Sequence, residues 1–397
     1  MVAHSYANTL ASFGHEVHVF TRTGQGKVPP QHPNVTVHTV RFLPLPVFFG
    51  VSVANGAVKE ILRMGNDFDI VHVHPPMTML SKKHYGQLRG GIVQTLHGTW
   101  RNERERMKLR EVSPNLEGIN EIAVITVSHV TDPLEEIAMS HSNGLIMISD
   151  QEMGHFADHG VANLSDRVVK IPSGVDTSLF DPKPTESERA GFRKRFGFGR
   201  NDRVLISVGR LVIRKNFAAL IDTFSKIIKN VPEARLLIVG EGPLEDGLNE
   251  QVRTLGLEGK VVFTSNHTFQ ELARFYACAD LFVFTPYYEG QGLVIMESMS
   301  AGTPCVSTDV GGVPEMIRQG VDGYHFPLGD YDRMVKHVTE LLRDDSKMTS
   351  FSKEARKSMV EMWDWKVVCR KIEKVYENIL KDPRDSPLRT PGSRQHR

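Results

Sequence analysis

Two short glycine-bearing segments carry residue types that can bind a diphosphate. The first, Tyr288-Glu-Gly-Gln-Gly-Leu-Val-Ile-Met-Glu297, follows an apolar run and opens a predicted helix at about Leu293. Its glycines let backbone come close to a ligand, and the free N–H groups of the first helical turn suit a diphosphate. Glu289 and Glu297 flank that position, so Glu297 could accept hydrogen bonds from ribose hydroxyls while Glu289 faces a sugar beyond the phosphates. The alternative interpretation is that neither residue binds a ligand: Glu289 is an exposed loop residue, and Glu297 only complements the helix dipole.

The second segment, Ser207-Val-Gly-Arg-Leu-Val-Ile-Arg-Lys-Asn216, supplies cations between a predicted strand and a predicted helix. Gly209 permits a tight turn, and Arg210 and Lys215 can bring two positive charges to a leaving diphosphate without a metal. The alternative is a polar loop whose cations are only solvated. A third turn, Gly240-Glu-Gly-Pro243, either approaches the nucleotide or is a plain Gly-Pro turn.

Short β-branched runs alternate with amphipathic segments of helix length along most of the chain. This alternation predicts an α/β fold with two Rossmann-like, doubly wound halves, each a parallel sheet covered by helices on both faces. The predicted strands are residues 15–20, 69–74, 92–96, 145–149, 203–208, 235–239, 260–263, 281–284 and 304–307. The predicted helices of the second half are residues 217–230, 244–255, 270–278, 293–301 and 333–343.

The length of 397 residues fits two domains of about 150 to 200 residues each. The polar stretch Asp181 to Asp202 is the best linker candidate, which places the boundary near residues 172 to 200. We predict an N-terminal domain over residues 1–172 and a C-terminal domain over 173–362, which holds both candidate diphosphate-binding segments. A terminal amphipathic helix over 363–380 and a disordered tail over 381–397 follow.

The N-terminal domain differs from the usual pattern at its start. An open α/β domain of this type normally begins with a central strand and a glycine-rich turn. This sequence begins in a predicted helix, Val2 to Phe13, closed by Gly14 as its C-cap. We therefore expect the first strand of this domain to be absent, either because the start codon was assigned late or because another segment fills the sheet.

The amino-acid composition restricts the classes of partner and the cellular location that we expect for this protein. The net charge of +1, from 48 basic and 47 acidic residues, supplies no field that would gather nucleic acid, so no nucleic-acid partner is predicted. Cys278, Cys305 and Cys369 are odd in number and widely spaced, which indicates small buried hydrophobic residues and a reducing cytoplasm. The longest apolar stretch, Leu43 to Val58, is interrupted well short of the ~18 residues that a membrane-spanning helix needs.

Several other features have a structural interpretation. His72 and His74 share one strand face without a third nearby ligand, so we interpret them as packing residues and predict no metal site. The charged run Trp100 to Arg110 is either a solvated helix or a surface for peripheral membrane contact. The segment Phe42 to Phe49 is either a buried loop or an apolar surface that contacts a substrate.

These motifs together resemble glycosyltransferase family 4 over nearly the whole chain. The resemblance rests on Gly209-Arg-Leu with Lys215-Asn216, Glu289-x7-Glu297, Asp309-Val-Gly-Gly-Val-Pro-Glu315, and Ile171-Pro-Ser-Gly-Val-Asp176 with Phe180. It implies the GT-B architecture, in which two Rossmann-like domains face each other across a cleft. It also implies transfer from a nucleotide sugar with retention of anomeric configuration and without a metal or other cofactor. Trp365 to Tyr376 resembles the family's terminal helix, which crosses back to the first domain.

The resemblance also implies roles for particular residues. It assigns the donor diphosphate to Arg210 and Lys215, the ribose to Glu297, and the phosphate and sugar to backbone at Gly292, Leu293 and Val294. Glu289 corresponds to the carboxylate near the donor sugar. His97, in Thr95-Leu-His-Gly98, matches a first-domain histidine that reaches the sugar.

Two positions depart from the family pattern. Gln291 replaces the bulky apolar residue usual between the two glycines, and Ser173 stands where Asn is usual before Gly174.

Two functions fit these observations. The first is an active hexosyltransferase that moves a sugar from a UDP- or GDP-sugar to a glycan, lipid or small-molecule acceptor. The second is a catalytically silent relative that binds a nucleotide sugar or acts as a scaffold. The presence of Glu289, Glu297, Arg210 and Lys215 favours the active enzyme. The base of the donor stays open, because we expect it to be recognised by loop backbone near Thr264 to Phe269.

Overall fold

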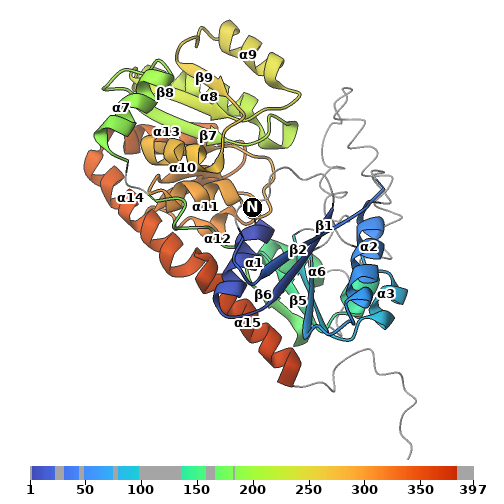
Figure 1. The fold of residues 1–397 in the computed structure, drawn as a ribbon. Coiled ribbons are helices and arrows are strands. Elements are labelled where there is room, and N and C mark those ends of the chain that lie inside the picture. Colours follow the sequence, from blue (N-terminus) through green and yellow to red (C-terminus); the bar gives the residue numbers. More distant parts are fainter. Residues whose placement is uncertain are drawn as a thin grey trace, which may run out of the picture. The chain divides into compact units, whose positions relative to one another are not determined.

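The computed structural model describes residues 2–22, 31–43, 49–74, 79–97, 136–157, 166–181 and 184–381 (Figure 1). Contacts divide the chain into two compact units. Unit 1 holds the described residues up to Pro172 and those from Val368 onward, and unit 2 runs from Ser173 to Val367. The chain therefore passes between the units twice, once after Pro172 and once after Val367.

Unit 2 is built on a six-stranded sheet in the order β12-β11-β10-β7-β8-β9, in which every neighbouring pair is parallel. Its strands are β7 Arg203–Val208, β8 Ala234–Val239, β9 Val261–Thr264, β10 Leu281–Phe284, β11 Cys305–Thr308 and β12 Gly323–Phe326. The order of strands along the chain reverses between β7 and β10. In open α/β sheets, ligands bind at the carboxyl ends of the strands beside such a switch point.

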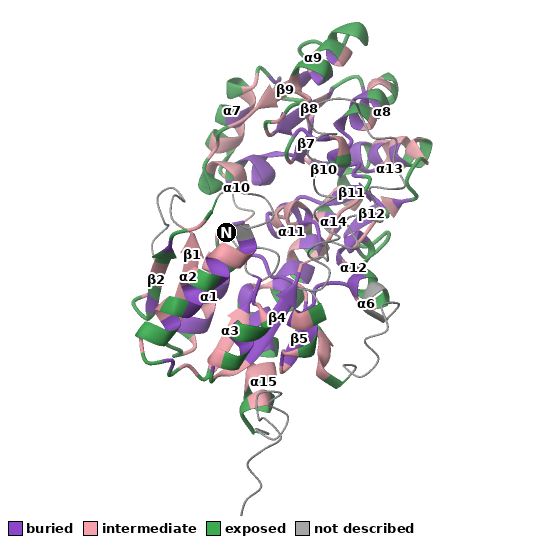
Figure 2. Cartoon of the chain, turned by 90° about the vertical axis from the view of Figure 1, so that its right-hand side faces the viewer, coloured by how far each residue is buried: buried purple, intermediate pink, exposed green. Residues whose placement is uncertain are grey.

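Helices cover both faces of this sheet. They are α7 Glu186–Arg195, α8 Phe217–Asn230, α9 Glu245–Thr254, α10 Phe269–Cys278, α11 Leu293–Ser300, α12 Val313–Met316, α13 Tyr331–Arg343 and α14 Asp345–Ser358. Because successive strand residues point to opposite faces, Phe282 and Phe284 of β10 enter one apolar core and Leu281 and Val283 enter the other. Figure 2 shows the buried residues along the strands and exposed residues on outer helices such as α9.

The segment from Asp181 to Asp202 is not a plain linker, which corrects the prediction from its composition. It contains α7, whose N-terminus is fixed by a capping box: Glu188 N donates to Thr185 Oγ1 at 3.2 Å, and Thr185 N donates to Glu188 Oε2 at 2.7 Å. Phe192 of α7 is buried in the core of unit 2. The capped N-terminus and the aromatic rings of Phe192 and Phe198 place this polar segment on the core.

Unit 1 has its strands in two separate parallel sheets. One pairs β1 Val17–Arg22 with β2 Val35–Val40, and the other has the order β3-β4-β5-β6. The strands of the second sheet are β3 Ile70–Val73, β4 Gly91–Leu96, β5 Gly144–Met147 and β6 Val168–Lys170. Within the described ranges, no strand joins the two sheets.

Helices pack on these sheets in unit 1. They are α1 Val2–Ser12, α2 Phe49–Arg63, α3 Lys82–Gln87 and α6 Asp150–Ala157. The first, α1, is followed by Gly14 at φ +101°, which agrees with the predicted C-cap. The core beneath α2 contains Val58 and Ile61 of that helix, Val73 of β3, and Phe20 of β1 packed against them, so α2 contacts both sheets.

The second crossing between the units lies within a helix. A 5-residue π-helix, Met359–Trp363, precedes α15, Trp365–Lys381, which begins in unit 2 and continues into unit 1. The predicted tail beyond residue 381 and the charged run 100–110 lie outside the described residues, as do residues 44–48. All three cysteines are free and buried, as the sequence predicted. In the described part of the chain, no helix has both the length and the apolar character needed to span a bilayer.

Candidate active site

The two predicted diphosphate loops follow the two strands that flank the switch point of unit 2. The Gly209–Asn216 loop follows β7, and the loop that begins at Pro286 follows β10. Backbone connects them directly, since Tyr287 N donates to Arg214 O at 2.9 Å. The structure therefore brings both loops to one edge of the sheet, where an open α/β sheet binds its ligand.

The third predicted turn, Gly240 to Pro243, supports the first loop. A Cβ at Gly240 would lie 1.9 Å from Gly209 O, and one at Gly242 would lie 2.5 Å from Leu211 O. Backbone bonds from Gly209 N to Val239 O (3.0 Å) and Leu211 N to Glu241 O (2.9 Å) hold this close approach. These glycines are explained by packing, so no ligand contact is needed to account for them.

Lys215 and Glu289 form an ion pair between the two loops. The Lys215 side chain is 11% exposed and that of Glu289 is 14% exposed. Lys215 Nζ also lies 5.1 Å from the ring centroid of Phe284, the last residue of β10. Arg210 lies on the same loop as Lys215 but is exposed. A diphosphate at this edge would therefore share Lys215 with Glu289 and could recruit Arg210 from solvent.

The second loop ends at the N-terminus of α11, where Gly292 is buried and Leu293 and Val294 are half-buried. Gly292 adopts φ +73°, and a Cβ there would lie 3.0 Å from Met316 Cε and 3.3 Å from Glu289 Cγ. The first N–H groups of a helix, here those of Leu293 and Val294, have no partner inside the helix and attract anions. The loop is braced from α12, because Gly312 N donates to the carbonyls of Glu289 and Gly290 at 3.3 and 3.1 Å.

Glu297 lies on α11 with its carboxyl surrounded by protein. Burial raises the pKa of Glu297 to about 7, and the hydrogen bond from Tyr276 Oη to Glu297 Oε2 (3.1 Å) offsets part of that rise. Sequence reasoning missed Tyr276. The sequence feature that could have identified it is a tyrosine on the buried face of α10, because a buried hydroxyl needs a hydrogen-bond partner.

The two departures from the family pattern contact each other. Gln291 Oε1 accepts a hydrogen bond from Ser173 N at 2.7 Å, and Gln291 Nε2 donates to Ser173 O at 2.8 Å. Both residues are buried. No feature of either residue taken singly signals this pairing.

His97 follows β4 in unit 1 and belongs to an array of partly buried polar rings. His97 Nε2 lies 3.1 Å from His74 Nδ1, and the His74 ring stacks on His72 with centroids 4.5 Å apart. His72 Nδ1 contacts the hydroxyls of Tyr6 (2.7 Å) and Tyr376 (2.6 Å). His72 Nε2 completes the array at Thr95 Oγ1 (2.7 Å). His72 and His74 are thus partly buried and hydrogen-bonded, and His97 is a third ring beside them that sequence spacing did not reveal.

Burial keeps these imidazoles neutral. It lowers the pKa of His97 to about 4 and that of His74 to about 3, with neighbouring imidazoles adding to the effect at His74. The pKa of His72 falls well below its usual value for the same reasons. At neutral pH, His97 can therefore act as a hydrogen-bonding group but not as a cation.

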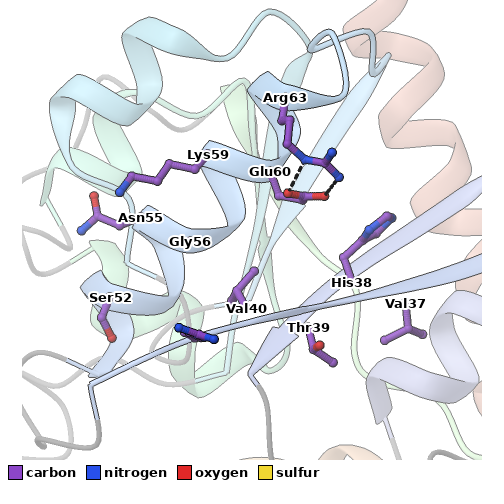
Figure 3. A pocket seen from close by; sticks show the side chains of 11 residues that line it. Val37, His38, Thr39, Val40, Ser52, Asn55, Gly56, Lys59, Glu60 and Arg63 are labelled. Carbon is purple, nitrogen blue, oxygen red and sulfur yellow. Dashed lines mark hydrogen bonds and ion pairs between the residues drawn. The ribbon is translucent and has the colours of Figure 1, made fainter.

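Unit 1 also contains an open pocket of about 690 Å³ between β2 and α2 (Figure 3). Within it, Arg63 forks onto Glu60 through Nε and Nη2 at 2.9 and 2.6 Å. The pocket is lined by Val37, His38, Thr39, Val40, Arg41, Ser52, Asn55, Gly56, Lys59, Glu60 and Arg63. It includes none of the predicted site residues. The described residues hold no cluster of three or more His, Cys, Asp or Glu side chains suited to a metal ion.

Comparison with known families agrees with this geometry. The model "Glycosyltransferase Family 4" matches residues 1–179, and the model "Glycosyl transferases group 1" matches residues 188–358. Together they cover both units, and the chain belongs to this family of glycosyltransferases, which use nucleotide-sugar donors.

Two relatives show the range of this similarity. N-acetyl-alpha-D-glucosaminyl L-malate synthase of Bacillus anthracis is 26% identical over 388 residues, covering 96% of this chain and 93% of that protein. The GDP-mannose-dependent alpha-(1-6)-phosphatidylinositol monomannoside mannosyltransferase of Mycolicibacterium smegmatis is 33% identical over 204 residues, or 49% of this chain and 52% of its own length.

Solved structures confirm the predicted fold of two Rossmann-like, parallel-sheet domains. Sucrose-phosphate synthase of Thermosynechococcus elongatus aligns with a TM-score of 0.75 at 19% identity, covering 95% of this chain and 92% of its own. HepE of Anabaena, in complex with UDP-glucose, aligns with a TM-score of 0.66 at 18% identity, covering 92% of this chain and 100% of its own.

Proposed function

We propose that this chain is a retaining hexosyltransferase that takes its sugar from a UDP- or GDP-sugar without a metal ion. The observation that carries the proposal is the gathering of Lys215, Glu289 and the α11 N-terminus at the switch-point edge of the unit 2 sheet. Cations and free N–H groups beside a carboxylate are what a departing nucleoside diphosphate and its sugar require.

The donor is held by three kinds of contact in this proposal. Backbone N–H groups at Gly292, Leu293 and Val294 receive the phosphates and the sugar. Lys215 and Arg210 supply the positive charge that a divalent cation supplies in other transferases. The ionised Glu297 accepts hydrogen bonds from the ribose hydroxyls.

The transfer itself needs no side-chain base. The acceptor oxygen forms a bond to the anomeric carbon on the face from which the diphosphate leaves, and the bond from that carbon to the phosphate oxygen breaks. The departing phosphate oxygen takes the acceptor proton, so charge and atoms balance. Glu289 orients the sugar and Lys215 together, and neutral His97 hydrogen-bonds a sugar hydroxyl from unit 1.

The acceptor is proposed as a hydroxyl-bearing small molecule, lipid or glycan. The names of the relatives contain L-malate and phosphatidylinositol monomannoside, a small acid and a lipid. We propose a cytoplasmic location, with peripheral contact at a membrane surface if the acceptor is a lipid.

The second candidate function is nucleotide-sugar binding without transfer. The division of the unit 1 sheet into two parts favours it, because a less continuous scaffold positions an acceptor less well. The complete set of charged groups in unit 2 favours transfer.

A transfer assay separates the two functions. The protein is incubated with UDP-glucose, UDP-N-acetylglucosamine or GDP-mannose, each with malate, inositol phosphate or phosphatidylinositol vesicles, in the presence of EDTA. We expect acceptor-dependent release of one nucleoside diphosphate and, by NMR, an α-linked product from the α-linked donor. A β-linked product would refute retention, and donor binding without acceptor-dependent release would establish the silent relative.

A further inference from the structure

The Gln291 side chain binds both backbone groups of one residue. Its amide accepts from Ser173 N at 2.7 Å and donates to Ser173 O at 2.8 Å, as a neighbouring strand would. Gln291 is 6% exposed and Ser173 is 8% exposed, so water cannot easily replace either bond. An apolar side chain at position 291 would leave the N–H and C=O of Ser173 without this partner, which is costly for buried backbone.

Gln291 lies within the donor loop itself. It stands between Gly290, whose carbonyl accepts from Gly312 N, and Gly292, the N-cap of α11. Its Nε2 also lies 3.6 Å from Met296 Sδ in α11. Moving this loop relative to Ser173 therefore requires breaking both bonds.

Ser173 begins the first of the two places where the chain crosses between the units. The residues that follow are fixed to the segment ahead of the second crossing. Val175 N donates to Trp363 O at 2.8 Å, and Trp365 N donates to Val175 O at 3.2 Å. Gly174 allows the contact, because a Cβ there would lie 2.7 Å from Trp365 Cδ2. Thr177 Oγ1 donates to Asp364 Oδ2 beside this bridge.

These contacts form an unbroken path inside unit 2 from the donor loop to both crossings. Any movement of one unit relative to the other must bend the chain at these crossings, since the chain passes between the units only there. We call the two hydrogen bonds between Gln291 and Ser173 the clamp. Because the clamp holds the donor loop to the residue at which the first crossing begins, it links the position of the loop to the geometry of that crossing. Such coupling is reciprocal: what moves one end moves the other.

We propose that Gln291 is a positioning residue that couples the donor loop to the crossing at Ser173. This inference rests on the proposed function of the loop. In this proposal, Gln291 helps to place the donor loop for the reaction after the nucleotide has bound. Nucleotide binding itself does not need the clamp, because the N–H groups of α11 can bind phosphate without it. Loss of the clamp should therefore lower turnover more than nucleotide affinity.

The central test compares Gln291→Leu with wild type. We expect kcat to fall at least tenfold, with the Kd for UDP or GDP, whichever wild type binds, within threefold. The matched control is Gln251→Leu, the same change at a glutamine of unit 2 whose Nε2 bonds Ala218 O and Asp222 Oδ1. The control should leave both constants within twofold. Unchanged kcat in Gln291→Leu, or a loss confined to nucleotide affinity, would overturn the coupling.

Gln291→Glu supplies a second, pH-dependent test if the leucine variant fails to fold. A protonated carboxyl has the shape and bonding pattern of the amide, whereas a carboxylate faces Ser173 O without a proton. The ratio of variant to wild-type kcat should therefore rise as pH falls from 8 to 5.5. Glu289 with Lys215, Glu297 on α11, and Asp364 beside the bridge are present in both proteins and cancel in the ratio. A ratio independent of pH would contradict the clamp.

Hydrogen exchange separates failure of this inference from failure of the proposed function. Gln291→Leu should raise amide exchange in peptides covering residues 171–177 and 288–294 together. If wild type neither binds UDP or GDP nor transfers a sugar, the proposed function fails, yet this measurement still decides whether the clamp exists. Faster exchange in the loop alone would show that Ser173 is held by other contacts.

Discussion

The two units of this protein differ in the charge of the polar side chains that they enclose. Unit 2 places charges at its candidate site: the Lys215–Glu289 ion pair and the carboxyl of Glu297, whose pKa lies near 7. Unit 1 encloses three partly buried imidazoles, His72, His74 and His97, whose lowered pKa values keep them neutral. The difference fits the proposed function, in which unit 2 holds an anionic leaving group and unit 1 offers neutral hydrogen bonds to sugar hydroxyls.

The two units also differ in the continuity of their sheets. Unit 2 has one continuous six-stranded sheet, and its loops at β7 and β10 are fixed by short backbone bonds. Unit 1 has two smaller sheets held together by the core under α2, and Tyr6 and Tyr376 meet at His72 beside them. We expect perturbation of unit 2 to show in nucleotide binding and catalysis, and perturbation of unit 1 to show first in stability.

The largest effect should follow Glu289→Ala. Removing this carboxylate frees Lys215 for the diphosphate but loses the group that orients the sugar, so kcat should fall by about 10²- to 10³-fold. Nucleotide affinity should change by less than about threefold, which steady-state kinetics and calorimetry would show. The control is Glu250→Ala, an exposed glutamate paired with Arg253. Equal turnover in Glu289→Ala and wild type would remove Glu289 from the proposed mechanism.

Acid should destabilise the two units differently. The folded pKa values of His97 (about 4) and His74 (about 3) lie below the unfolded value of 6.5, so the unfolded chain binds more protons between these limits. Their contribution to the free energy of unfolding is present above pH 6.5 and is lost as pH falls toward 4. For His97 alone the loss is about 3 kcal/mol.

Glu297 has the opposite sign. Its folded pKa of about 7 lies above the unfolded value of 4.5, so its contribution is present below pH 4.5 and lost as pH rises through 7. Hydrogen exchange of β4 and β7 peptides from pH 7.5 to 5, corrected for intrinsic rates, compares the units. We expect protection of β4 to fall relative to β7, and His97→Gln to reduce that fall. The same pH response in both units would break the comparison.

Lys215→Met should weaken binding of the nucleoside diphosphate by about tenfold to hundredfold, the range for a lost charge-assisted hydrogen bond. His97→Ala, in unit 1, should leave that affinity within about twofold, because a neutral imidazole offers a diphosphate no charge. The matched control is Lys226→Met, whose exposed pair with Asp332 should contribute little. Calorimetric titration with UDP and GDP makes the measurement. A larger loss in His97→Ala than in Lys215→Met would reverse the assignment of the two units.

The smallest effect should be the pH dependence of nucleotide binding over the single pH unit from 7 to 6. Because ribose hydroxyls donate to the ionised carboxylate, affinity should fall by up to about tenfold for each pH unit below 7. Glu297→Gln should bind more weakly and lose this slope. A slope that survives in Glu297→Gln would assign the titration to another group.

Much of unit 2 could be predicted from the sequence, because its strands are short, apolar and separated by glycine-bearing turns. The predicted strands 203–208 and 281–284 match β7 and β10, and the predicted helix 217–230 matches α8. Periodicity failed where the pattern is weak or the element is short, and α7 was interpreted as a linker despite its capping box. The elements that were not predicted are β2, β6, β12, α2, α3, α6, α12 and α14.

The contacts that define the site could not be predicted in the same way. Lys215 and Glu289 are 74 positions apart, and Ser173 and Gln291 are 118 apart, so only the folded sheet brings them together. The family resemblance implied a role for Lys215 and another for Glu289, but it did not imply the ion pair between them. The neutrality of His97 likewise follows from its burial beside His74, which sequence spacing does not reveal.

The most direct test of the donor site is a calorimetric titration of UDP, GDP and ADP into wild type and into the double variant Lys215→Met/Glu297→Ala, with EDTA present. We expect one nucleotide to bind wild type, and its affinity to fall by at least a hundredfold in the double variant while the fold is kept. Equal affinity in the two proteins would contradict the placement of the donor at the loops after β7 and β10.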